Sequence, residues 1–460
     1  MVNSSSESEW RLYPEAEAWI AAQVESLKEP VPAARALADS LLPRAGCRLV
    51  DWLDHIVVAG GDRPRAELRE LGFEPEDIEA AAGDEVYHLP GAVLPRVVLR
   101  DQPALTAGGA AGAYLQVDSI ARFLSAHRRS VPIEGSPLSP YRRAKAWGQA
   151  GLELGVVERR GHSGLVPMTM PVDYPDRYLR ALEVWAGRPR IFGRAQDGMI
   201  ETLALAKRLV AELGADMAAW IFIEAERAFW RQRNRAGQVQ KARQDGLGLG
   251  WANQDHCAFR SSRESFTLLI EILKTLGFQR RERFYAGAEA GWGAQVMEQP
   301  ACRFAVFCDV DLSPDEVDAD FSVESLAPRR ELGTIGLWCA LHGESMLAGG
   351  THHLAARIDF DAISAGLAEW DVKIMRPFSD FLYLRQAFTR GERWAVDPGR
   401  LGRLVAQGQI TPEQSAQFAD KGALGSHLEI IQRGQGFKGF NQRMVSDIIQ
   451  RTDPRLGGSG

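Results

Sequence analysis

Apolar and polar positions along the chain follow two periods, and each period predicts one kind of element. Short runs of apolar or alternating residues are typical of β-strands. The clearest of these runs are residues 49–58, 92–99, 114–120, 154–160, 303–308 and 428–433. Apolar residues at helical spacing predict helices, which we expect at residues 15–28, 63–71, 199–213, 215–235 and 264–276. The pattern therefore predicts a protein of mixed α and β structure.

The order of these elements repeats. A strand, a helix and a closing strand run from residue 49 to residue 101, and the same order returns between residues 256 and 309. An Asp-His pair lies at the first strand of each copy, at residues 54–55 and 255–256. Such internal similarity is stronger evidence about architecture than local propensity is.

A second pair of β-α-β segments follows the first pair, at residues 114–133 and 353–374. Together they predict an α+β fold made of four β-α-β-β-β modules in two halves, with a helical segment inserted between them. At 460 residues the chain is too long for one ordinary domain. The predicted parts are an N-terminal helical segment (1–45), a non-catalytic half (46–172), a helical insertion (173–250) and a catalytic metal-binding half (251–455).

Composition and charge limit the classes of partner that the protein could bind. The net charge of −6 provides no general attraction for nucleic acid or anionic membrane, and no apolar run is long enough to span a membrane. The N-terminus lacks the order of a signal peptide. Five cysteines form no C-x-x-C pair, as is typical of a reducing compartment. We expect a cytoplasmic protein without a nucleic-acid or membrane partner.

The candidate chemistry begins with Glu429, a carboxylate inside an apolar strand, where burial is costly unless a cation meets it. His256 and His353 each lie on the first strand of a predicted module, 97 residues apart, and Glu429 follows 76 residues later. Two imidazoles and one carboxylate on one face of an ion are the ligand set of non-heme Fe(II) oxygenases. The spacing therefore predicts that His256, His353 and Glu429 bind Fe(2+).

Other interpretations stay open from the residues alone. Histidines on apolar strands are often hydrogen-bonded core residues, and Glu429 could pair with Arg433 or Arg385 instead of a metal. His427 lies two residues from Glu429, on the same strand face, and is a rival ligand.

The first half of the chain keeps little of this set. Alignment of the modules puts Gly112 where His353 stands and Val156 opposite Glu429, and only His55 survives. A second metal site is therefore not expected.

Several motifs in the second half resemble known families. The segment from Glu429 to Asn441 resembles the C-terminal signature of 4-hydroxyphenylpyruvate dioxygenases and hydroxymandelate synthases, which belong to the vicinal oxygen chelate superfamily. A histidine followed four residues later by arginine, the His-Leu-x-x-Arg motif at 353–357, the segment 384–388 and Glu-Ile-x-Gln-Arg-Gly at 429–434 resemble the 2-oxoadipate dioxygenase/decarboxylases, also called hydroxyglutarate synthases. This second likeness covers about residues 250–450. The chain departs from this family in two ways: its N-terminal half is different, and we do not expect the family's helical C-terminal extension in this sequence.

The resemblance implies a vicinal oxygen chelate fold and an Fe(II)-dependent dioxygenase that decarboxylates and hydroxylates a 2-oxo acid similar to 2-oxoadipate. A small 2-oxo acid and O2 would be its partners. Arg260, four residues after His256, is the expected catalytic anchor for the distal carboxylate of the substrate, because a guanidinium suits a carboxylate. Arg357, Gln386 and Gln432 are further candidates for substrate binding.

Three alternatives remain. The first is an aromatic 2-oxo acid dioxygenase of the hydroxyphenylpyruvate or hydroxymandelate type. The second is a metal-dependent isomerase or lyase on the same scaffold. The third is a binding or resistance protein without catalysis.

Overall fold

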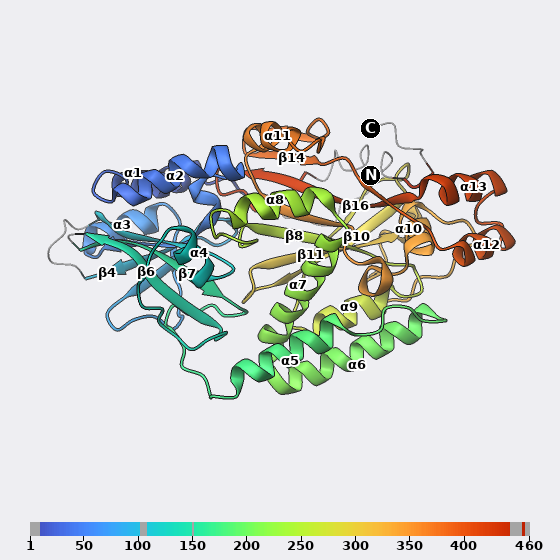
Figure 1. Cartoon of the computed structure of the whole chain (residues 1–460), viewed down its shortest axis with the longest axis horizontal. Coiled ribbons are helices and arrows are strands. Elements are labelled where there is room, and N and C mark those ends of the chain that lie inside the picture. Colours follow the sequence, from blue (N-terminus) through green and yellow to red (C-terminus); the bar gives the residue numbers. More distant parts are fainter. Residues whose placement is uncertain (1–9, 102–107, 150, 442–452, 456–460) are drawn as a thin grey trace.

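The computed structural model describes residues 10–101, 108–149, 151–441 and 453–455. The chain forms two mixed β-sheets with helices around them, one sheet in each half (Figure 1). The strands of each sheet come from repeated modules, so the predicted α+β class with repeated modules in two halves is confirmed.

The first sheet has the strand order β2-β3-β4-β1-β5-β7-β6. Its first module consists of β1 (Leu53–Ala59), α3 (Asp62–Glu70), β2 (Glu74–Pro75), β3 (Glu85–His88) and β4 (Arg96–Arg100). The second consists of β5 (Ala110–Gln116), α4 (Ile120–Ala126), β6 (Tyr141–Gln149) and β7 (Leu152–Arg159). This module is one strand short of the prediction. Between α4 and β6 only Glu134 forms a bridge, which pairs it with Arg143 of β6.

The second sheet repeats the plan, and its second module has the strand that the first sheet lacks. Its first module consists of β8 (Gln254–Arg260), α9 (Phe266–Thr275), β9 (Gln279–Tyr285), β10 (Trp292–Gln299) and β11 (Phe304–Asp311). Its second consists of β12 (His353–Arg357), α11 (Phe360–Ala368), β13 (Ser379–Phe381), β14 (Leu384–Phe388) and β16 (Ala423–Arg433). Strands β8 and β12 pair antiparallel, and each pairs in parallel with the last strand of its own module. In the first sheet, β1 and β5 are related in the same way.

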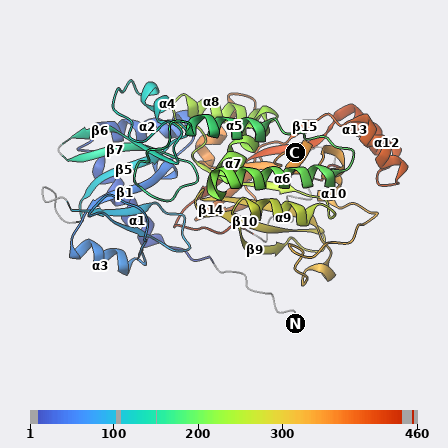
Figure 2. The same cartoon turned by 90° about the horizontal axis from the view of Figure 1, so that it is seen from below.

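Helices occupy the ends and the middle of the chain. They are α1 (Pro14–Leu27), α2 (Pro32–Ala45), α5 (Tyr174–Ala186), α6 (Ala195–Leu213), α7 (Ala215–Gln232) and α8 (Arg235–Asp245). Helices α7 and α9 pack against one face of the second sheet, and α6 packs on these two helices (Figure 2). The two long helices expected near residues 199 and 215 are therefore present. The domain boundaries drawn from the sequence stay a prediction.

Further elements lie between the strands of the second half: α10 (Thr334–His342), β15 (Glu392–Trp394), α12 (Pro398–Ala406) and α13 (Pro412–Lys421). Within the described ranges, no helix has the length and apolar character needed to cross a membrane.

One predicted strand begins later than expected. Residues Leu49–Trp52 form a 3-10 turn, and β1 starts only at Leu53. The carboxylate of Asp51 accepts hydrogen bonds from the backbone N–H and the guanidinium of Arg48, which closes the turn locally. A side-chain bond of this kind competes with strand pairing for the backbone.

Alternation along β8 divides the second half into a core and a cavity. Cys257 and Phe259 point to the helices, where the Phe259 ring lies 5.6 Å from the ring of Phe222 on α7. His256 and Arg260 point to the opposite face, into a cavity. Cys257 therefore points away from the histidine beside it.

Candidate metal centre

Strand register brings the three predicted ligands to one place. On β8 and β12, His256 pairs with Ala355, and Ala355 pairs in turn with Glu429 on β16. Residues paired directly across a sheet share a face, and so do residues two apart on one strand. His353 therefore points to the same side as His256 and Glu429. The small side chain of Ala355 leaves the space between them open.

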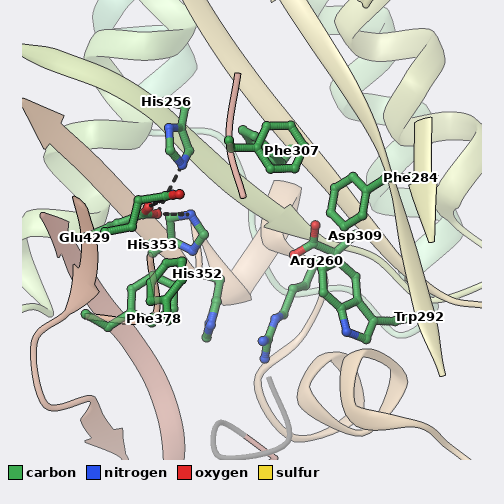
Figure 3. A pocket seen from close by; sticks show the side chains of 13 residues that line it. His256, Arg260, Phe284, Trp292, Phe307, Asp309, His352, His353, Phe378 and Glu429 are labelled. Atoms are coloured by element: carbon green, nitrogen blue, oxygen red, sulfur yellow. Dashed lines mark hydrogen bonds and ion pairs between the residues drawn. The ribbon is translucent and has the colours of Figure 1, made fainter. Parts of the chain in front are cut away.

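The ligand atoms converge on one point (Figure 3). Nε2 of His256 and Nε2 of His353 each lie 3.1 Å from Oε2 of Glu429, and all three ligand atoms fall within 4.8 Å of one another. The side chains of His256 and Glu429 are 5% and 2% exposed. Neither ring nitrogen of His353 has a hydrogen-bond partner of acceptable geometry. Because buried polar atoms are normally bonded, a ring nitrogen of His353 is available as a donor to a metal cation.

The electrostatics of the site favour a cation. Burial opposes ionisation of Glu429, but His256 and His353 outweigh it and hold the pKa of the Glu429 carboxyl well below its usual range. Burial likewise opposes a charge on His256, yet Glu429 and Asp255 raise the His256 pKa to about 9. A group of negative charges that attracts a proton this strongly also attracts a divalent cation, which displaces that proton on binding.

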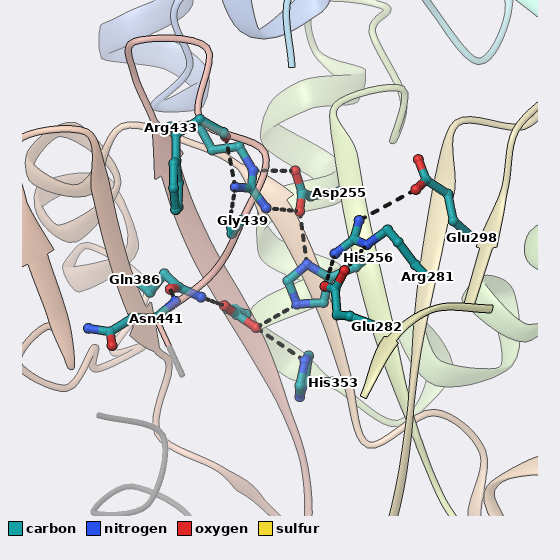
Figure 4. A network of polar contacts seen from close by, with 12 residues as sticks. Asp255, His256, Arg281, Glu282, Glu298, His353, Gln386, Arg433, Gly439 and Asn441 are labelled. Carbon is teal, nitrogen blue, oxygen red and sulfur yellow. Dashed lines mark hydrogen bonds and ion pairs between the residues drawn. The ribbon is translucent and has the colours of Figure 1, made fainter. Parts of the chain in front are cut away.

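A polar network fixes the orientation of the ligands (Figure 4). Nδ1 of His256 donates to Oδ1 of Asp255 over 2.9 Å, which leaves Nε2 as the metal-facing atom. Asp255 is held in turn by two 2.9 Å hydrogen bonds from the Arg433 guanidinium. Nε2 of Gln386 donates to the other oxygen of Glu429 over 2.9 Å. Such partners usually tune the affinity of a metal site, so Gln386 serves the ligand Glu429 as well as lining the cavity.

Asp255 was not among the functional residues predicted from the sequence, although it is part of the repeated Asp-His pair. Its signal was its position directly before a predicted ligand. Its partner Arg433 is 178 residues away in the chain, so the pair itself is visible only in the fold.

The cavity in front of the ligands is small and mostly aromatic. About 50 Å³ of it is accessible to the centre of a water molecule. Its aromatic wall consists of Phe284, Trp292, Phe307, Phe378, Phe388 and Phe440. These rings come from strands β9, β10, β11 and β14 and from loops at Phe378 and Phe440, and the chain pattern gave no sign that they would meet. They make most of the cavity wall apolar.

Arg260 lies in the wall of the same cavity with its charge unbalanced. The side chain is 1% exposed in a pocket of aromatic rings, and its Nε and Nη1 have no hydrogen-bond partner. Burial lowers the pKa of Arg260 to about 10. Asp309, which pairs with Arg260 in register, also lines the cavity, and burial raises its pKa to about 7 although Arg260 opposes the shift. The arginine is therefore available to an anionic ligand.

Arg357 lies elsewhere. Strands β8 and β12 run antiparallel, so the residue four places after His256 and the residue four places after His353 project to opposite ends of the metal site. Arg357 lines a different cavity, between the two halves of the chain. The expectation that Arg357 meets the substrate together with Arg260 is not supported by this placement.

Gln432 also points away from the metal. Its Oε1 accepts a hydrogen bond from the backbone N–H of Phe360 over 2.9 Å, at the first turn of α11. Alternation along β16 explains this, because Gln432 is an odd number of residues from Glu429. Its position indicates a role in holding the helix.

The rival ligand His427 is not part of the cluster. Its Nδ1 donates to the carbonyl oxygen of Thr389 over 3.1 Å, and its ring packs 5.2 Å from the ring of Phe388. His352 donates in a similar way to the carbonyl of Gly425 over 2.9 Å. Each histidine is therefore held by a backbone carbonyl through Nδ1, and among the described residues Nε2 of His427 is buried without a hydrogen-bond partner.

Among the described residues of the first half, the first sheet has no equivalent of the cluster. His55 pairs with Tyr114, and Tyr114 pairs with Gly155, so Gly155 and not Val156 takes the place of Glu429. A Cβ atom at Gly155 would lie 2.2 Å from the Tyr114 ring, which fills the space of a carboxylate. Gly112 stands in the place of His353, as predicted from the alignment.

No protein-family model matches the chain, and no curated protein sequence matches it. Solved structures with a similar arrangement include a variant of 4-hydroxymandelate synthase from Streptomyces coelicolor, at 12% identity and a TM-score of 0.28, over 87% of this chain and 98% of that one. Methylmalonyl-CoA epimerase from Mycobacterium tuberculosis is 14% identical, with a TM-score of 0.23, over 40% of this chain and 89% of that one. Likenesses this low carry no conclusion about activity, so the proposed function rests on the site itself.

Proposed function

We propose that the chain is a non-heme Fe(II)-dependent dioxygenase. It decarboxylates and hydroxylates a small 2-oxo acid with a distal carboxylate, similar to 2-oxoadipate, and uses O2. The observation that carries the proposal is the combination of His256, His353 and Glu429 with an unpartnered Arg260 in one cavity. The ligand set suits Fe(II) with open positions, and the arginine supplies a charge for the far end of the substrate.

The protein's own groups would do four things. The triad would hold the metal, which supplies open coordination positions and redox chemistry toward O2. Asp255 and Gln386 would keep the ligands oriented. Arg260 would hold the distal carboxylate with two parallel hydrogen bonds, as guanidinium groups do. The aromatic wall would keep water out.

A second candidate is an aromatic 2-oxo acid dioxygenase. The observation that favours it is the set of six aromatic rings around the cavity. Such a substrate would leave Arg260 unpaired unless it carried a polar group on its ring. The two candidates therefore differ in how strongly turnover depends on Arg260.

The test is anaerobic loading with Fe(II), followed by measurement of O2 uptake and CO2 release with a panel of 2-oxo acids. The panel includes 2-oxoadipate, 2-oxoglutarate and 4-hydroxyphenylpyruvate. We expect a dicarboxylic acid to give coupled O2 uptake and CO2 release that is lost in His256→Ala and kept in the control His127→Ala, a histidine of the first half. Metal binding without O2 uptake on any 2-oxo acid would refute a dioxygenase and favour an isomerase or lyase.

A further inference from the structure

A large charged cavity that the proposed function leaves unused lies between the two halves. One wall comes from the β3–β4 region of the first half, and the opposite wall comes from strands β8 to β12 of the second. About 310 Å³ of it is accessible to the centre of a water molecule, far more than in the metal cavity. Arg357 and Arg303 both line it.

The walls of this cavity carry more positive than negative charge. Six cations face three carboxylates: Arg96, Arg281, Arg303, Arg357, Arg433 and Lys438 against Glu76, Asp255 and Glu298. Each of the three carboxylates already has a cation. Glu76 pairs with Arg96, Asp255 with Arg433, and Glu298 with Lys438. Figure 4 shows two of these carboxylates with arginine partners, Asp255 with Arg433 and Glu298 with Arg281.

Two arginines are left over. Among the described residues, the Arg357 guanidinium has no hydrogen-bond acceptor, and its Nε is buried without a partner. Arg303 lies 3.6 Å from Oδ1 of Asp54, but Asp54 is already held by the Arg159 guanidinium at 2.9 and 2.8 Å. Burial lowers the pKa of Arg357, and desolvation together with the charge of Arg96 lowers the pKa of Arg303 to about 9. The Arg303 side chain is 34% exposed, so solvent and a ligand can reach it. Within the described part of the chain, Arg357 therefore has no hydrogen-bonded counter-ion, and Arg303 shares its only one with Arg159.

We propose that this cavity binds a small molecule with at least two anionic oxyacid groups, carboxylate or phosphate. Arg303 and Arg357 would each take one group. The cavity is distinct from the metal cavity, because Arg357 projects from the opposite end of the β8–β12 pair.

The proposed site is connected to the metal centre through one ion pair. Arg433 lines the cavity between the halves and also holds Asp255, which orients His256. An anion beside Arg433 would compete with Asp255 for the guanidinium. Occupancy of the cavity would therefore weaken the hold on His256 and lower the affinity of the triad for metal, and metal would oppose the anion equally.

The test is calorimetric titration of the metal-free full-length protein with two probes that each carry two anionic groups, pyrophosphate and succinate. Tighter binding of pyrophosphate identifies a phosphate-bearing ligand, and tighter binding of succinate a dicarboxylate. We expect Arg357→Gln and Arg303→Gln each to weaken the preferred probe by about tenfold or more, which is the loss of one charged hydrogen-bonding group. Arg385→Gln, an exposed arginine paired with Asp361 and Asp380, is the matched control and should bind normally.

Two results would overturn the proposal. One is the absence of binding by either probe to the wild-type protein. The other is binding that survives Arg303→Gln and Arg357→Gln but is lost in Arg260→Gln, which would place the anion in the metal cavity. Thermal unfolding of each variant without probe verifies that the variant is folded. If a Gln variant is unfolded, Arg303→Lys or Arg357→Lys takes its place. A Lys variant keeps the positive charge, so it should bind the probe more tightly than a folded Gln variant. Because this test needs neither metal nor turnover, its outcome is separate from that of the dioxygenase assay.

Discussion

Replacement of Asp255 by asparagine tests the metal centre without touching a ligand. The carboxylate makes three contacts of 2.9 Å, one with Nδ1 of His256 and two with the guanidinium of Arg433. Asparagine keeps the shape but removes the negative charge. His256 and Arg433 would then compete for one acceptor oxygen, because the amide offers one where the carboxylate offers two. His256 would lose its fixed tautomer and part of its basicity.

The expected loss of metal affinity follows from the role of Asp255 as the hydrogen-bond partner of His256. Outer partners of metal-bound histidines typically change metal affinity by about 10–100-fold, equivalent to about 1.4–2.7 kcal/mol. We expect the upper part of this range, because the Asp255 side chain is only 10% exposed and water cannot replace it. Arg433 keeps its hydrogen bonds to the carbonyl oxygens of Phe437 and Gly439, so the following loop should stay in place.

The assay is anaerobic titration with Fe(II), and with Co(II) as an oxygen-stable substitute, in competition with a chelator. The control is Asp380→Asn, which removes an aspartate of the same chemistry from an exposed pair with Arg385. Exposed pairs contribute about 0–1 kcal/mol, and this one is remote from the triad. An affinity of Asp255→Asn equal to that of the control, in folded protein, would refute the reasoning.

Three further predictions concern the same cavity. Arg260→Gln should raise the KM for a dicarboxylic 2-oxo acid by about tenfold or more with metal affinity unchanged, as steady-state kinetics and metal titration can show; an unchanged KM would exclude Arg260 as the anchor. Glu429→Ala should abolish metal binding and His427→Ala should not, and the reverse result in a chelator competition would exchange their roles. Burial raises the pKa of Asp309 to about 7, so its protonated form contributes stability that is complete below the ordinary value of 3.8 and is lost as the pH rises through 7. Relative to Asp309→Asn, the wild-type free energy of unfolding in urea should therefore fall by up to about 4 kcal/mol between about pH 4 and pH 8, and a constant difference would contradict the pKa.

The sequence by itself selected the candidate ligands of the site. Period-two alternation decides which residues of a strand share a face, and the internal repeat decides which strands are equivalent. His256, His353 and Glu429 stand at matched positions of such strands, so they could be chosen without knowledge of any contact. The same reasoning placed Arg260 on the face of His256.

The tertiary structure decided what depends on strand direction and on register. Arg357 has the same spacing from its histidine as Arg260 has, yet it lies in another cavity because β12 runs antiparallel to β8. The strand pairing of the first sheet makes Gly155 the equivalent of Glu429, one residue before the predicted Val156. The Asp255–Arg433 pair and the aromatic wall join residues from separate strands. Local periodicity fixes the face of each side chain, but only the pairing of distant strands fixes which faces meet.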